Sequence, residues 1–435
     1  MEMILIQGGQ QLRGTIPVAG AKNAALPILM ATLVAPGEHK LERVPQLVDV
    51  STTLSLLGRI GCPSLLGADH SIRLDTSRIS FNEAPYDLVR KMRASVLALG
   101  PLLARCGEAR VSLPGGCAIG VRPIDQHLKG LEALGCEFEL TDGYVHGKVK
   151  HLRGARIRLD FPTVTGTENI LMAAVLAEGE TVLENCAREP EIIDLVHFLQ
   201  SLGARIEGEG SATLRIQGVP ELTPAATPYS VMPDRIEAGT YLVAGAITGG
   251  DLTVTGVRPN DMLPITEALE ASGCGIQATS DSIRVWRKGP IRPITLDTQP
   301  HPGFPTDMQA QLMALLSLAD GESVIRENIF ENRFMHVPEL VRMGADIQCA
   351  NSCATITGVE SLAGASVMAT DLRASASLVL AGLAAEGQTR VLRIYHLDRG
   401  YERLVEKLQS VGAQVARAPE GRAELSGLAL VSATG

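Results

Sequence analysis

The chain repeats one pattern six times, with a period of about 70 residues. In each copy an apolar, helix-like segment ends at a glycine, and these glycines are Gly37, Gly107, Gly179, Gly249, Gly321 and Gly387. A second helix-like segment in each copy runs through a glycine into a short strand-like segment, at residues 57–62, 134–136, 202–204, 272–274, 343–345 and 411–413. Glycine suits these helix ends because it accepts the left-handed backbone conformation there. Two such series with the same period predict a duplicated structural unit.

The repeated unit reads as helix, glycine, strand, loop, second helix, Leu-Gly and strand. This alternation predicts an α/β chain in which one unit is too small to bury its own sheet. Six units in 435 residues exceed what one hydrophobic core usually holds, so we expect two domains of three units. The proline-rich segment from Gly218 to Pro228 is the linker that we predict near the midpoint.

Composition excludes several classes of protein. With 45% hydrophobic and 20% charged residues the chain is not disordered, and a net charge of −9 with 3% aromatic residues argues against a nucleic-acid partner. We see no signal peptide and no apolar run of about 18 residues, so we expect no membrane association. The eight cysteines lack the spacing of a zinc site, and we expect reduced thiols in the cytoplasm.

A polar residue stands fourteen positions before each glycine of the first series. The six residues are Asn23, Arg93, Thr165, Arg235, Asp307 and Arg373. Helix capping accounts well for asparagine, threonine and aspartate, but arginine at a helix N-terminus opposes the macrodipole. The three arginines therefore predict helix ends that face an anion. In an acidic protein, such a local cluster of basic residues indicates an anionic small-molecule substrate.

Two segments carry candidate catalytic groups. Cys117 lies in a glycine-rich loop after Pro114-Gly115-Gly116, and Arg122 close by would favour its thiolate. Asp307 follows the rigid Pro305-Thr306 and is either a helix cap or a general base for a substrate hydroxyl. The charged loops at 331–336 and 395–402 are either surface ion-pair networks or parts of a site.

Several motifs together resemble the enolpyruvyl transferase family, in particular its members that act on UDP-N-acetylglucosamine. The resemblance spans essentially the whole chain. Its motifs are Gly20–Pro27, Met92–Ser95, Leu113–Cys117, Pro305–Gln309, Glu331–Phe334, Asp371–Ser375 and His396–Glu402.

The resemblance implies an α/β fold of two inside-out α/β barrels, built from six repeats of a βαβαββ-like unit. The first domain would be 22–231 and would carry the Cys117 loop. The second would combine 1–21 with 232–435, and the active site would lie in the interdomain cleft.

The reaction that the resemblance implies is transfer of the enolpyruvyl group of phosphoenolpyruvate to the 3-hydroxyl of UDP-N-acetylglucosamine. Phosphate is released by addition and elimination through a tetrahedral intermediate, with no metal and no organic cofactor. This transfer opens the synthesis of peptidoglycan precursors in the cytoplasm. It therefore implies roles in cell wall biogenesis, cell shape, the cell cycle and cell division.

The resemblance also assigns residues. The implied catalytic residues are Cys117, Asp307, Lys22 and Arg399, where Cys117 is the proton donor, can carry a pyruvate-derived adduct and is alkylated by fosfomycin. The implied phosphoenolpyruvate ligands are Lys22, Asn23, Arg122, Arg373 and Arg399. The implied UDP-N-acetylglucosamine ligands are Arg93, Arg122, Pro123, Ile124, Asp125, Gln126, Thr163, Val164, Asp307 and Ile329. Supporting residues would be Glu331, Arg333 and Asp371.

One segment departs from the family pattern, and two other functions stay open. Residues 161–169 read Phe-Pro-Thr-Val-Thr-Gly-Thr-Glu-Asn instead of a form that begins Lys-Val-Ser-Val, which leaves open the atoms that contact the diphosphate. One alternative is a catalytically silent paralogue that binds a UDP-sugar. The other is the transferase that acts on shikimate 3-phosphate, which would lack the Pro-Gly-Gly-Cys loop. The sequence does not predict the oligomeric state.

Overall fold

The computed structural model describes residues 2–90, 92–113 and 123–421, which divide into two compact units. Among these residues, one unit holds the chain up to Ala19 and from Pro233 on, and the other runs from Gly20 to Met232. Each unit has its own large hydrophobic core. We describe the units separately.

The Gly20–Met232 unit contains three four-stranded sheets of the same design. In each, a short strand lies parallel to a longer one, which pairs antiparallel with the second strand of a hairpin. In spatial order the sheets are β14 (Tyr229–Ser230), β3 (Glu38–Glu42), β5 (Ile72–Asp75), β4 (Ser64–Leu66); β6 (Glu83–Ala84), β7 (Glu108–Ser112), β9 (Tyr144–Lys148), β8 (Glu137–Thr141); and β10 (Arg156–Arg158), β11 (Glu180–Glu184), β13 (Thr213–Gln217), β12 (Arg205–Glu207).

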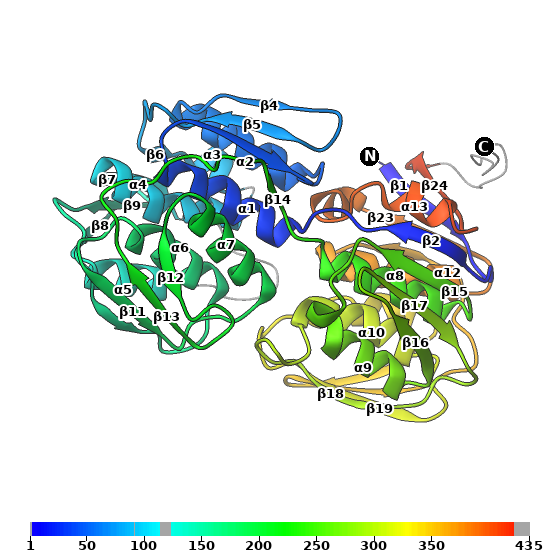
Figure 1. The fold of residues 1–435 in the computed structure, drawn as a ribbon. Coiled ribbons are helices and arrows are strands. Elements are labelled where there is room, and N and C mark those ends of the chain that lie inside the picture. Colours follow the sequence, from blue (N-terminus) through cyan, green and yellow to red (C-terminus); the bar gives the residue numbers. More distant parts are fainter. Residues whose placement is uncertain (1, 91, 114–122, 422–435) are drawn as a thin grey trace. The chain divides into compact units, whose positions relative to one another are not determined.

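The helices of this unit fall into two sets (Figure 1). The first set lies in the core and comprises α1 (Lys22–Ala31), η1 (Thr32–Val34), η2 (Arg93–Ala98), α4 (Leu99–Cys106) and α6 (Val164–Ala174). The short α3 (Tyr86–Val89) precedes η2 and buries only Val89. The second set is amphipathic and comprises α2 (Val48–Ile60), α5 (Asp125–Ala133) and α7 (Pro190–Ser201). Core helices surrounded by sheets are the arrangement of an inside-out α/β barrel.

The second unit repeats this design, and the N-terminal strands complete it. Its sheets are β2 (Arg13–Pro17), β15 (Asp251–Thr255), β17 (Ser282–Arg287), β16 (Cys274–Ala278); β18 (Thr295–Asp297), β19 (Glu322–Arg326), β21 (Cys353–Thr357), β20 (Asp346–Ala350); and β22 (Ser366–Met368), β23 (Gln388–Leu392), β1 (Glu2–Gln7), β24 (Gln414–Pro419). Its core helices are α8 (Arg235–Ile247), η4 (Thr306–Met308), α10 (Gln309–Leu316) and α12 (Leu372–Ala384). Its other helices are η3 (Pro259–Met262), α9 (Leu263–Ala271), α11 (Val337–Arg342), η5 (Ile394–Arg399) and α13 (Leu404–Gln409).

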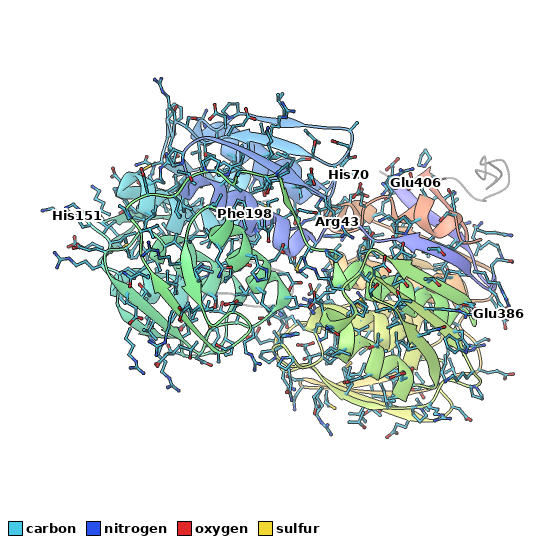
Figure 2. The ribbon with its side chains drawn as sticks, viewed as in Figure 1. Arg43, His70, His151, Phe198, Glu386 and Glu406 are labelled. Carbon is cyan, nitrogen blue, oxygen red and sulfur yellow. The ribbon has the colours of Figure 1, made fainter. Side chains whose placement is uncertain are left out.

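Strands from distant parts of the sequence close the pattern. β1 pairs antiparallel with both β23 and β24, and β2 lies parallel to β15. In the other unit, β14 gives β3 its parallel neighbour. Tyr229 fixes β14 because its hydroxyl donates to the Asp194 backbone oxygen at 2.8 Å and its ring packs edge-on against Phe198 at 5.1 Å. Phe198 is 1% exposed, whereas His151 lies on the surface of the same unit (Figure 2).

The glycine series have the conformation that the repeat predicts. All six glycines from Gly37 to Gly387 have positive φ, between 65° and 136°. The glycines that end the second helices also have positive φ, at Gly61, Gly135, Gly203, Gly273, Gly344 and Gly412. An L side chain is strained in this region, which explains why glycine recurs there.

The predicted linker is wrong. The segment from Gly218 to Pro228 belongs to the Gly20–Met232 unit, and the division falls after Met232. The amide of Gly218 donates to the Gly179 oxygen, that of Val219 donates to the Val175 oxygen, and Leu222 is 1% exposed. The prolines therefore lie in a segment that is anchored to one unit and does not separate the two. In the described part of the chain, no helix combines the length and the hydropathy of a transmembrane segment.

Candidate functional site

The six residues of the polar register each lie in the first turn of a core helix. Asn23, Thr165 and Arg373 are the second residues of α1, α6 and α12. Arg93 and Arg235 begin η2 and α8, and Asp307 is the second residue of η4. The predicted placement at helix N-termini is therefore confirmed in every repeat.

Aspartate caps explain how two of these helices tolerate an arginine in the first turn. The Asp371 carboxylate accepts hydrogen bonds from the amides of Arg373 and Ala374, at 2.8 and 3.0 Å. Asp234 caps α8 in the same way, ahead of Arg235. A negative N-cap offsets the unfavourable interaction between an arginine and the helix dipole.

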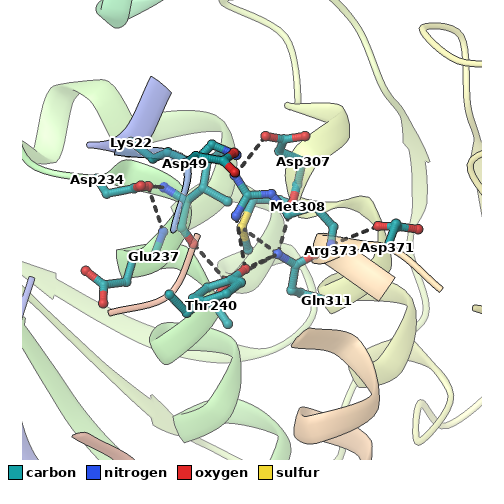
Figure 3. A network of polar contacts seen from close by, with 12 residues as sticks. Lys22, Asp49, Asp234, Glu237, Thr240, Asp307, Met308, Gln311, Asp371 and Arg373 are labelled. Atoms are coloured by element: carbon teal, nitrogen blue, oxygen red, sulfur yellow. Dashed lines mark hydrogen bonds and ion pairs between the residues drawn. The ribbon is translucent and has the colours of Figure 1, made fainter. Parts of the chain in front are cut away.

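Asp307 lies between two arginine side chains in the unit that contains α12. One of its carboxylate oxygens accepts from Arg333 at 2.7 Å. The other accepts from Arg373 at 2.9 Å, and Asp307 and Arg373 are both labelled in Figure 3. Both arginine side chains are only 4% exposed, while the Asp307 side chain is 27% exposed. Burial disfavours the charged guanidinium of Arg373, but Asp307, Tyr401 and Asp234 together outweigh this effect and raise the pKa of Arg373 above its usual value. The cluster can bind an anionic ligand and also supplies a carboxylate that can accept a proton.

Other predicted residues of this unit lie on the segments around this cluster. Arg399 ends η5 and is half-buried, and Ile329 is half-buried after β19, where its amide donates to Glu327 at 2.9 Å. Glu331 is exposed in the turn that leads to Arg333.

Lys22 is held at the start of α1 by a buried carboxylate of its own unit. Its Nζ lies 3.0 Å from Asp49 Oδ2, and the two side chains are 12% and 3% exposed. Asp49 lies in the first turn of α2, and no motif in the sequence points to it. Asn23 follows Lys22 and is half-buried.

The segments before α5 and α6 hold the predicted nucleotide ligands of this unit. Arg93 donates to the backbone oxygen of the exposed Pro123 at 3.3 Å, next to the buried Ile124. Gln126 and Asp160 exchange two hydrogen bonds, of 2.8 and 2.9 Å, which tie the start of α5 to the segment before α6. Asp125 is exposed at the first position of α5, while Thr163 caps α6 through its hydroxyl and Val164 begins that helix.

His127 on α5 makes two hydrogen bonds to α6 and was not singled out in the sequence. Its Nδ1 accepts from the Asn169 amide at 3.0 Å, which makes Nε2 the donor to the Thr165 hydroxyl at 3.2 Å. The same Asn169 amide donates to the Val96 oxygen, and its carbonyl accepts from the Gly100 amide. Burial, together with the charge of Arg93, lowers the pKa of His127 to about 3. His127 is therefore neutral, and it positions Thr165 at the start of α6.

We expect His127 to make the protein less stable in acid. Its pKa in the folded state lies below the value of about 6.5 in the unfolded state, so the unfolded state binds the proton first as the pH falls. Between about pH 6.5 and pH 5 this should remove about 2 kcal/mol from the free energy of unfolding. In denaturant titrations, the free energy of unfolding of His127→Gln should fall less than that of the parent over this pH interval. At pH 6.5 the variant should be less stable than the parent. His151→Gln, at an exposed position of the same unit, is the control, and equal acid sensitivity of the His127→Gln and parent proteins would contradict the assignment.

Cys117 and Arg122 lie outside the residues that the structure describes. Within the described residues, no group of three or more His, Cys, Asp or Glu side chains is arranged to hold a metal ion.

Comparison with known proteins assigns a class to this fold and these clusters. The family model for EPSP synthase (3-phosphoshikimate 1-carboxyvinyltransferase) matches residues 6–408, nearly the whole chain. Curated relatives named UDP-N-acetylglucosamine 1-carboxyvinyltransferase narrow the match to one branch of this family. The one from Nitratidesulfovibrio vulgaris strain Miyazaki F is 57% identical over 422 residues, and the one from Trichlorobacter lovleyi is 56% identical over 423. Each alignment covers 97% of this chain and 100% of the relative. The chain therefore belongs to the enolpyruvyl transferase family, among its UDP-N-acetylglucosamine 1-carboxyvinyltransferases.

Solved structures agree with the fold. The enolpyruvyl transferase NikO from Streptomyces tendae superposes with a TM-score of 0.87 at 28% identity, and the match covers 96% of this chain and 99% of that one. An EPSP synthase from Acinetobacter baumannii has a TM-score of 0.75 at 18% identity, covering 96% of this chain and all of that one. The two-domain inside-out α/β fold expected from the sequence is the fold of this family.

Proposed function

We propose that this protein transfers the enolpyruvyl group of phosphoenolpyruvate to the 3-hydroxyl of UDP-N-acetylglucosamine, with release of phosphate. The observation that carries the proposal is the set of relatives with this activity in their names, 54–58% identical over 97% of the chain. The cationic groups Lys22, Arg93, Arg373 and Arg399 support it, because both substrates carry several negative charges.

In the addition step we assign the proton transfers to Cys117 and Asp307. The Cys117 thiol gives its proton to C3 of phosphoenolpyruvate, and C2 thereby becomes electrophilic. The 3-hydroxyl oxygen of the sugar bonds to C2 while Asp307 accepts the hydroxyl proton. The product of this step is a tetrahedral ketal that carries both the carboxylate and the phosphate.

In the elimination step the C2–O bond to phosphate breaks as the leaving phosphate takes the proton held by Asp307. A proton then passes from C3 back to the Cys117 thiolate, which restores the carbon–carbon double bond and both side chains. The leaving phosphate and the neighbouring carboxylate gain or keep negative charge, so fixed cations stabilise this step. We assign this role to Lys22, Arg122, Arg373 and Arg399, with Asn23 beside them.

The remaining predicted residues bind the nucleotide sugar or orient the cluster. We propose that Arg333 and Asp371 hold Asp307 and Arg373, as their contacts of 2.7 and 2.8 Å support, and that Glu331 assists from the adjacent turn. The proposed UDP-N-acetylglucosamine ligands are Arg93, Arg122, Pro123, Ile124, Asp125, Gln126, Thr163, Val164, Asp307 and Ile329. Because these assignments draw on both units, we propose two catalytic domains, 22–231 and 1–21 with 232–435, which act on one substrate pair.

The cellular role follows from the proposed product. Enolpyruvyl-UDP-N-acetylglucosamine is a precursor of peptidoglycan, so we propose roles in cell wall biogenesis, cell shape and cell division. We place the reaction in the cytoplasm, which the free thiols of the seven described cysteines support. Alkylation of Cys117 by fosfomycin is part of the proposal, because its thiolate can open the epoxide.

A phosphate-release assay with two acceptors tests the function. The purified protein should release phosphate from phosphoenolpyruvate when UDP-N-acetylglucosamine is present, and not when shikimate 3-phosphate is present. Release with shikimate 3-phosphate alone would assign the other transferase activity. Binding of UDP-N-acetylglucosamine without phosphate release would identify a silent paralogue, and either result would overturn the proposal.

A further inference from the structure

The buried hydroxyl of Tyr401 lies directly behind the guanidinium of Arg373. Arg373 Nη1 donates to this hydroxyl at 3.2 Å, on the side away from the contact of Nη2 with Asp307 at 2.9 Å. The Gln311 amide also donates to the Tyr401 hydroxyl at 3.2 Å, and Thr240 lies 3.0 Å from it. Among the residues that the structure describes, Arg373 thus has one polar contact toward Asp307 and one toward the core.

The hydrogen bonds around Tyr401 have a defined direction. The Thr240 hydroxyl donates its proton to the Ile236 backbone oxygen at 2.8 Å, so its oxygen accepts from Tyr401. The Tyr401 oxygen in turn accepts from Arg373 and Gln311, which are both N–H donors. The protons therefore point along one path, from Arg373 through Tyr401 and Thr240 to the backbone of α8.

Three helices and a loop hold this path. Thr240 lies on α8, Gln311 on α10 and Arg373 on α12, and the side chains of Thr240, Gln311 and Arg373 converge in Figure 3. Tyr401 follows η5 and is 2% exposed, with its ring centre 5.5 Å from the Arg373 guanidinium carbon. If the Tyr401 hydroxyl is removed, an N–H group of Arg373 is left buried without an acceptor. The free-energy cost of that unpaired group favours a shift of the guanidinium.

We infer that Tyr401 is a positioning residue, which fixes the Arg373 guanidinium in the orientation that binds phosphoenolpyruvate. The inference rests on the proposed function, because it gives Tyr401 its effect through a substrate ligand. Tyr401 lies in the motif 396–402, for which the sequence analysis assigned a role to Arg399 only.

Tyr401→Phe tests the inference because it removes the hydroxyl and keeps the ring. The KM for phosphoenolpyruvate should rise about tenfold, the size expected for a lost hydrogen bond to a charged group, while the KM for UDP-N-acetylglucosamine stays the same. Tyr241→Phe is the matched control. Tyr241 is as deeply buried in the same unit, and its hydroxyl contacts Glu237 at 3.4 Å instead of Arg373.

Substitution of Thr240 tests the direction of the path. Thr240→Val removes the acceptor of the Tyr401 proton and should raise the KM for phosphoenolpyruvate. Thr240→Ser keeps the hydroxyl and should have the KM of the parent. A Tyr401→Phe protein with a lower melting temperature and an unchanged KM for phosphoenolpyruvate would overturn the inference. So would equal effects of Tyr401→Phe and Tyr241→Phe on that KM.

The increase in melting temperature that phosphoenolpyruvate causes on binding separates this inference from the proposed function, because it does not depend on turnover. An inactive parent protein would overturn the function. The increase in melting temperature with phosphoenolpyruvate would still be compared, and it should be smaller for Tyr401→Phe than for the parent. Equal increases would overturn the inference alone.

Discussion

Asp307→Asn should lower kcat by about two to four orders of magnitude, the usual range for loss of a general base. Asparagine keeps an oxygen that can accept from Arg333 or Arg373, but it cannot take the proton of the sugar hydroxyl. The KM for phosphoenolpyruvate should not rise, because removing a carboxylate that pairs with Arg333 and Arg373 leaves these arginines more available to a substrate anion. Steady-state phosphate release at saturating UDP-N-acetylglucosamine measures both constants.

Asp251→Asn provides the control for a lost arginine pair. Asp251 also accepts two hydrogen bonds from an arginine, Arg284, at 2.8 and 2.6 Å, but both side chains lie at the surface of a sheet. An exposed pair contributes little to stability, so this variant should keep the kinetics of the parent. An Asp307→Asn protein with more than about a tenth of the parent's kcat would contradict the role of Asp307 as the base.

Cys117→Ala should reduce turnover at least a hundredfold, since no other residue is assigned to protonate C3 of phosphoenolpyruvate. The melting temperature should stay close to that of the parent, because the substitution removes only one thiol from a glycine-rich sequence. Treatment with fosfomycin should add one inhibitor mass to the parent protein and none to the variant, as intact-mass spectrometry would show.

The exposed Cys106 gives the matched control for the thiol. Cys106→Ala should keep both turnover and the fosfomycin adduct. Near-normal turnover of Cys117→Ala, or an adduct that persists in it, would contradict the proton-donor assignment. A loss of activity in both variants would point to general damage instead.

The repeat predicted more of this molecule than any single motif did. The period of about 70 residues predicted that twelve glycines end helices and that Arg93, Asp307 and Arg373 lie in first turns, as the structure has them. This was possible because helix capping and positive φ are local properties. The spacing could not predict which strands close the sheets. β1 and β14 pair with strands far away in the sequence, and this pairing depends on tertiary packing.

The contacts within the candidate site were likewise beyond the reach of spacing. Asp49 looked like any acidic residue in a first turn, yet it pairs with Lys22. Thr240 and Tyr401 are 161 residues apart, and only the packing of the core brings their hydroxyls together. The linker prediction failed for a related reason, since proline content indicates local stiffness and does not show where one compact unit ends and the next begins.

A crystal structure of Asp307→Asn with UDP-N-acetylglucosamine and phosphoenolpyruvate would test the central claim most directly. The slow variant should hold both substrates, with the carboxylate and phosphate of phosphoenolpyruvate in contact with Lys22, Arg373 and Arg399 and the sugar 3-hydroxyl next to residue 307. Phosphoenolpyruvate bound away from Lys22 and Arg373, or a sugar hydroxyl that faces neither residue 307 nor C2 of phosphoenolpyruvate, would contradict the account.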